Sequence, residues 1–120
     1  MGDFEEFVRD IIDVLTYEEQ NRLYEMEMWL MNGEGIWVLE DNFIAFLGRV
    51  LNDTKTFSIE NRVTLLRLLA YGANQDDFSM LLHLDRKSHV IMNYAKDFDK
   101  LPILEQEALA LMVSKKYLCG

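Results

Sequence analysis

The chain contains 120 residues, of which 50% are hydrophobic, and its formal net charge is −9 at pH 7. This length is typical of one domain, and the apolar content is sufficient for a hydrophobic core, which excludes a disordered tail. The negative charge argues against nucleic acid and anionic membrane as partners, and no apolar run approaches the ~18–20 residues that cross a bilayer.

Two helices are predicted in the N-terminal third. In the first, from Asp3 to Leu15, apolar residues recur at the three- and four-residue spacing of one helical face. Thr16 and Glu19 then match a capping box, in which the hydroxyl and the carboxylate each accept a hydrogen bond from a free backbone N–H group. This cap opens a second helix, which we expect to end at Asn32, before a glycine-containing turn.

The middle of the chain predicts two more helices. Residues 36–51 carry one apolar stripe, and a polar turn follows them. Ser58 is the expected cap of the fourth helix, whose body is apolar on most sides. We therefore expect this helix to be the central and most buried element. Its two arginines, Arg62 and Arg67, need either an exposed edge or a carboxylate partner.

Three further helices are predicted in the C-terminal part. Asp76 is the expected cap of a short fifth helix, and Asp85 is that of a sixth. Pro102 suits the first turn of a last helix, because a backbone N–H group at that position has no acceptor within the helix. The predicted inward residues are Phe78, Leu81 and Leu82 in the fifth helix, Val90, Ile91 and Tyr94 in the sixth, and Leu104, Ala108, Leu111 and Met112 in the last.

The expected fold class is all-α, with six to seven helices, because no segment shows the alternation of a half-buried strand. Short connections without a Pro- or Ser-rich linker predict a single all-helical domain over residues 1–120. Two architectures stay open at this point. One is a compact helical bundle, and the other is a stack of helical hairpins of the armadillo or HEAT type.

Charge is distributed unevenly along the chain. Residues 1–41 contain twelve acidic residues and two bases, whereas the remainder contains nine acidic residues and ten bases. Such asymmetry steers a basic partner to the acidic end of a molecule. It is also common on solvated surfaces, and a solvated face is the interpretation favoured here.

Side chains that carry out chemistry are scarce. His83 and His89 lie six residues apart, whereas histidines that share a metal on a helix are three or four apart. No phosphate loop, nucleophile motif or calcium loop occurs. The sequence therefore predicts no catalytic residue, no metal site and no cofactor, and hence a protein that is not an enzyme. With one cysteine, Cys119, and no basic, apolar leader, we expect an intracellular protein, cytoplasmic or nuclear.

A cluster of methionines surrounds Trp29 in the second predicted helix. Met26, Met28 and Met31 have soft, flexible side chains of a kind that lines adaptable binding surfaces. Helical spacing does not allow one stripe to bury all four residues, and core packing is the favoured interpretation. If the cluster is exposed instead, Trp29, Met28 and Met31 are candidate partner-binding residues, because aromatic anchors dominate protein interfaces.

The fourth predicted helix resembles part of a known family. The run FSIENRVTLLRLL at 57–69 is similar to the F-P-x-x-D-L-L-R-L-L helix of PUL domains, the armadillo-like modules at the C-terminus of phospholipase-A2-activating protein and its relatives. The run EQEALAL at 105–111 resembles the later N-Q-x-x-A-L-R helix of that family. Ser58 replaces the usual proline, and Ala110 replaces an arginine. The resemblance implies either a shortened PUL domain or the N-terminal half of a longer one.

The resemblance also implies a non-catalytic protein–protein interaction module, an adaptor of the ubiquitin pathway. PUL domains dock onto the ubiquitin-selective AAA ATPase, valosin-containing protein, and hold its acidic C-terminal tail in a basic groove. In this chain Arg62, Arg67, Arg86 and Lys87 would form the corresponding patch. The expected partner is therefore another protein or a peptide tail. The alternative is a helical adaptor similar to the death-fold class, which assembles through complementary charged patches.

Overall fold

Helices make up the regular secondary structure of this protein wherever it is described. A computed structural model describes residues 2–32, 40–72, 83, 85–87 and 89–118. The elements are α1 (Gly2–Ile11), the 3-10 helix η1 (Ile12–Val14), α2 (Tyr17–Asn32), α3 (Glu40–Asn52), α4 (Ile59–Gly72), α6 (Val90–Ala95), the 3-10 helix η3 (Phe98–Lys100) and α7 (Ile103–Leu118). The described ranges contain no strand, and the predicted all-α fold class is confirmed.

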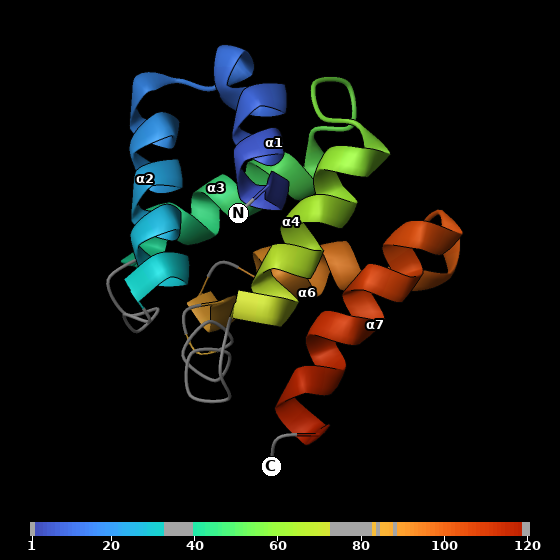
Figure 1. Cartoon of the computed structure of the whole chain (residues 1–120). Coiled ribbons are helices and arrows are strands. Elements are labelled where there is room, and N and C mark those ends of the chain that lie inside the picture. Colours follow the sequence, from blue (N-terminus) through green and yellow to red (C-terminus); the bar gives the residue numbers. More distant parts are fainter. Residues whose placement is uncertain (1, 33–39, 73–82, 84, 88, 119–120) are drawn as a thin grey trace.

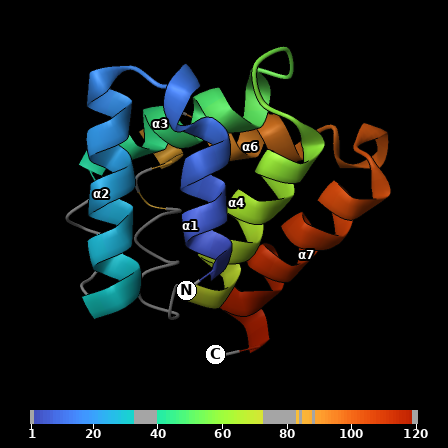
Figure 2. The same cartoon turned by 45° about the horizontal axis from the view of Figure 1, so that its top comes forward.

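The helices are arranged in two layers (Figures 1 and 2). α1 and α2 run antiparallel, α4 lies beside α1, and α7 lies beside α4 on the side away from α2. Behind this row, α3 and α6 pack against each other. The radius of gyration is 13.3 Å, close to the ~13.6 Å of a compact domain of this length. The extents of 36 × 34 × 29 Å are also similar in all directions. The structure therefore matches the compact bundle among the two architectures that the sequence leaves open.

The central position predicted for the fourth helix is confirmed. α4 packs against α7, α1 and α3. Its leucines Leu65 and Leu66 are fully buried, and so are the α3 phenylalanines Phe43 and Phe46, whose ring centroids lie 6.1 Å apart. Because α4 contributes apolar residues on several sides, the surrounding helices share one continuous core.

Two predicted helix caps are present with both of their hydrogen bonds. The Thr16 N–H donates to Glu19 Oε1 at 2.8 Å, and the Glu19 N–H donates to Thr16 Oγ1 at 3.2 Å. At the start of α4 the same exchange joins Ser58 and Asn61, with both distances 3.1 Å. These bonds satisfy backbone donors that have no partner inside the helix, which explains where α2 and α4 begin.

Asp85 caps α6, but from a greater distance along the chain than the usual N-cap. Its buried carboxylate accepts hydrogen bonds from the backbone N–H groups of Ile91 and Met92, at 2.9 and 3.2 Å. The residue at the N-cap position itself is His89, which has a left-handed backbone with φ of 54°. Ile91 and Tyr94 point into the core as predicted.

Some predicted boundaries differ from those observed. The first helix ends at Ile11 and continues as η1, after which Leu15 is extended. The third helix begins at Glu40, while residues 36–39 lie outside the described residues. The predicted fifth helix, with Phe78, Leu81 and Leu82, also lies outside them.

The inward face predicted for the last helix is wrong at two of its four positions. Ala108 and Met112 are buried, but Leu104 and Leu111 are 53% and 37% exposed. Glu105, which is 1% exposed, occupies the inward position instead. The predicted inward face named only apolar residues, whereas an ionised carboxylate such as that of Glu105 is rarely buried unless it is paired.

Glu105 can be buried because its carboxylate accepts three hydrogen bonds from two neighbouring side chains. Arg62 donates to Glu105 Oε1 from Nε at 2.9 Å and from Nη2 at 2.7 Å, and the Tyr94 hydroxyl donates to Glu105 Oε2 at 2.5 Å. The remaining Arg62 Nη1 donates to the Phe57 carbonyl at 2.7 Å. Burial and the bond to Glu105 raise the pKa of Tyr94, so its phenol remains a donor. We refer to Arg62, Tyr94 and Glu105 as the polar network. It connects α4, α6 and α7.

Replacement of Leu66 tests the central position of α4. Because its side chain is fully buried, Leu66→Ala should lower the free energy of unfolding by ~2–5 kcal/mol. Urea denaturation monitored by circular dichroism measures this change. A decrease below ~0.5 kcal/mol, which is typical of surface positions, would contradict the assigned core.

Replacement of Glu105 tests the polar network. Glu105→Leu leaves the buried Arg62 guanidinium without its carboxylate, which should lower the free energy of unfolding by ~3–5 kcal/mol. The double variant Arg62→Met/Glu105→Leu removes both charges and should recover most of that loss, as apolar replacements of buried pairs often do. Additive losses in the double variant would show that the two side chains do not stabilise the fold as a pair.

Candidate functional site

A groove between α1 and α4 is the candidate site. α1 packs against α4 through its apolar face, on which Phe4, Phe7 and Ile11 are buried. Beside this contact the two helices border a depression of about 240 Å³. The described residues that line it are Glu6, Phe7, Asp10, Glu60, Thr64, Arg67 and Leu68.

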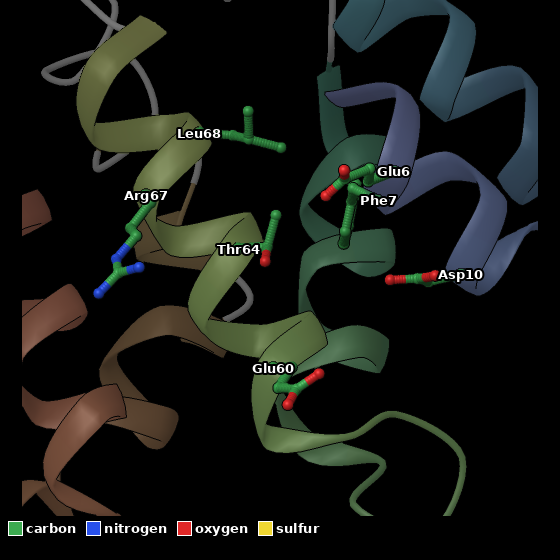
Figure 3. Close-up of a pocket in the computed structure, with 7 residues that line it drawn as sticks. All are labelled: Glu6, Phe7, Asp10, Glu60, Thr64, Arg67 and Leu68. Atoms are coloured by element: carbon green, nitrogen blue, oxygen red, sulfur yellow. The ribbon is translucent and has the colours of Figure 1, made fainter. Parts of the chain in front are cut away.

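Helical spacing places these side chains on facing edges of the two helices (Figure 3). Glu6 and Asp10 are four residues apart on α1 and therefore share an edge, as do Thr64 and Leu68 on α4. Glu6 and Asp10 project toward α4, and Thr64 and Leu68 project toward α1. Arg67 is the exception, because its guanidinium points away from α1.

The groove is electronegative. Glu6, Asp10 and Glu60 are exposed at its rim, and none of them forms an ion pair with another described residue. The guanidinium of Arg67, which also lines the groove, points away from α1. Half-buried Leu68 and buried Phe7 add apolar surface to the lining of the groove. This arrangement suits a cation carried on an aliphatic stem, such as a lysine or arginine side chain.

The methionine and tryptophan cluster is divided between core and surface. Trp29 is 1% exposed and Met26 is fully buried, so both belong to the core. Met28 is 52% exposed and remains available on the surface of α2. Met31 lies in α2, but its side chain falls outside the described residues. The favoured interpretation of core packing therefore holds for the tryptophan and fails for Met28.

Of the four bases assigned to a patch, one is not on the surface. Arg62 is buried in the polar network. Arg67, Arg86 and Lys87 are exposed. Arg67 borders the acidic groove. Both outcomes predicted for the α4 arginines thus occur, since one has a carboxylate partner and the other an exposed edge.

A second depression, of about 510 Å³, lies between α2 and α3 and contains an ion pair. Arg49 bonds to the Glu19 carboxylate, donates to the Val14 carbonyl at 3.1 Å, and lies 5.2 Å from the Phe57 ring centroid. Partial burial opposes ionisation of Glu19, but the hydrogen bonds from Arg49 and Thr16 outweigh it and lower its pKa. Because Arg49 and Glu19 already pair with each other, this depression is a weaker candidate for binding.

The lowered pKa of Glu19 predicts a dependence of stability on pH. A carboxylate with a depressed folded pKa stabilises the fold above its unfolded pKa, and this contribution is lost as the pH falls through the folded value. At pH 7 the wild type should therefore be ~0.5–1 kcal/mol more stable than Glu19→Gln. The difference should decline below about pH 4.5, the reference value of this carboxyl. Urea denaturation across this pH range measures the stability difference, and the exposed Glu18→Gln is the matched control. If the two variants lose the same stability at every pH, the pairing of Glu19 with Arg49 is contradicted.

Among the described residues, the histidine and acidic side chains are the possible ligands of a metal ion. His83 and His89 are exposed, and His89 Nδ1 lies 3.4 Å from the sulfur of Met92. No three histidine, cysteine, aspartate or glutamate side chains come close enough to hold a metal ion in the part of the chain that the structure describes. Cys119 lies outside that part. Among the described helices, none combines the length and the apolar character that a membrane span requires.

Comparisons of the chain with protein-family models, with curated proteins and with solved structures found no match.

Sequence reasoning did not identify the acidic groove. The signal was present in part, because Glu6 and Asp10 are four residues apart and the acidic excess of the N-terminal third was noted. What the sequence does not provide is the proximity of Glu60, which is far away along the chain and reaches the groove only because α1 packs on α4.

Proposed function

We propose that this protein is a non-catalytic protein–protein interaction module that receives a basic segment of its partner in the α1–α4 groove. The observation that carries the proposal is the set of three carboxylates, Glu6, Asp10 and Glu60, that line the groove together with apolar Phe7 and Leu68. A bound lysine or arginine places its stem over Leu68 and its charge among the carboxylates. Such a contact between opposite charges favours fast and selective association.

The size of the groove supports a side chain as the occupant. Its volume of about 240 Å³ lies below the ~300–1,000 Å³ of typical small-molecule sites. The larger depression between α2 and α3 is lined by Thr16, Glu18, Glu19, Arg22 and Arg49 together with Ala45 and Phe46. That mostly polar lining differs from the apolar lining of ligand pockets.

Two narrower versions of this function remain predictions. In the PUL-type version an acidic tail of valosin-containing protein docks on a basic surface, for which exposed Arg67, Arg86 and Lys87 are available. In the death-fold-like version, copies or partners assemble through charged patches. The α1–α4 groove favours a basic ligand over an acidic one because its carboxylates would repel an acidic tail.

A peptide titration tests the proposed function. A fluorescent peptide rich in lysine and arginine should bind the wild type, while a peptide with glutamine at the same positions should not. The variant Glu6→Gln/Asp10→Asn/Glu60→Gln removes three rim charges, each contributing ~0.2–1 kcal/mol, and should weaken binding about 3- to 160-fold. Fluorescence anisotropy at low and physiological salt measures the affinity, which should fall as salt rises.

A control of equal charge makes the result specific to the groove. Glu18→Gln/Asp97→Asn/Asp99→Asn also removes three exposed carboxylates, all of them outside the groove. This variant should bind the basic peptide within about twofold of the wild type. If both triple variants lose the same affinity, the peptide senses net charge and the groove is not the site. Preferential binding of an acidic peptide would support the PUL-type version instead.

A further inference from the structure

α7 is apolar on two opposite sides. Its inner side, with Ala108, Leu109 and Met112, packs into the core around Glu105. Its outer side carries exposed apolar residues, namely Ile103 (66%), Leu104 (53%) and Leu111 (37%), together with exposed Ala110. A helix that is apolar around most of its circumference is normally buried on both sides. Among the described residues, α7 is covered on one side only.

The polar network fixes which side faces outward. Glu105 is held by Arg62 and Tyr94, so the helix cannot rotate about its axis without breaking a buried ion pair. In that orientation Leu104 and Leu111, seven residues apart, lie on one line of the outer side. Their exposure therefore follows from the way the fold is anchored.

The position of α7 leaves its outer side accessible. In both views α7 lies at the edge of the bundle, with α4 on its inner side and the α1–α2 pair beyond α4. The outer side is thus separate from the α1–α4 groove, and two ligands can occupy the two places at the same time.

One charge lies within this apolar surface. Glu107 is exposed between Leu104 and Leu111, three residues after the first and four before the second. It makes no ion pair with any residue the structure describes. A helix that covers the surface must therefore bring a base to this point, because a buried carboxylate without a partner is costly.

A second copy of the chain is disfavoured as the partner, because two chains of net charge −9 repel each other. The charge pattern therefore favours a different protein.

We propose that the outer side of α7 binds an amphipathic helix of a partner protein, with the apolar stripe of that helix on Leu104 and Leu111 and a lysine or arginine facing Glu107. This docking surface is independent of the α1–α4 groove. Together the two surfaces allow the protein to connect a basic segment on one face with a helix on another.

Two designed peptides test this proposal on the full chain. Both are amphipathic helices of about 18 residues, above the ~12–15 residues below which isolated helices are marginal. One carries lysine in the middle of its leucine stripe, and the other carries glutamate at that place. The lysine peptide should bind the wild type at least ~10-fold more tightly, because like charges facing each other are repelled. Glu107→Lys should reverse this preference.

Surface variants locate the binding. Leu104→Ser/Leu111→Ser, whose fold is checked by circular dichroism, should lose at least ~10-fold in affinity for the lysine peptide. The control Tyr17→Ser/Tyr24→Ser removes two exposed aromatic side chains from α2 and should bind as the wild type does. Absence of binding by either peptide, or equal affinity for both, would overturn the proposal. Sedimentation gives one further outcome that would overturn the proposal. If the wild type is a dimer and Leu104→Ser/Leu111→Ser is a monomer, the surface binds a second copy of this chain.

Discussion

The buried pair of Arg62 and Glu105 determines how the C-terminal half of the bundle is assembled. Two ionised groups that leave water lose hydration, and this loss is compensated only when their hydrogen bonds are complete. Here the guanidinium has the carboxylate and the Phe57 carbonyl as acceptors, and the carboxylate has Tyr94 as a further donor. The pairing thereby specifies the rotation of α7 and its contact with α4 and α6. Apolar packing alone would leave that rotation less well defined, because α7 has apolar residues on both sides.

Apolar periodicity was sufficient to predict the elements that do not depend on distant partners. Phe4, Phe7 and Ile11 mark the inner face of α1 at the spacing of a helix, and all three are buried. The caps at Thr16 and Ser58 are local patterns whose hydrogen bonds join residues three apart. Such features can be read from a short window of sequence because the interacting groups are neighbours in the chain.

The inward face of α7 and the acidic groove could not be predicted in the same way. Hydrophobicity ranks Glu105 as a surface residue, and only the presence of Arg62 and Tyr94 makes its burial favourable. The groove similarly requires that Asp10 and Glu60, on different helices, lie across from each other. In both cases the decisive contact joins residues distant in sequence, and a single sequence gives no information on which helices are neighbours.

The polar network has a consequence for the order of events during synthesis. Arg62 and Glu105 are 43 residues apart, and contacts between distant residues form late because a long loop must first be closed. α1, α2, α3 and α4 leave the ribosome before Glu105 does. Until that residue arrives, Arg62 has no carboxylate and the side of α4 that later carries α7 faces water. We therefore expect a stage of synthesis in which most of the bundle has formed but the final helix has not yet docked. At that stage the exposed leucines of α4 are the surface most prone to aggregation.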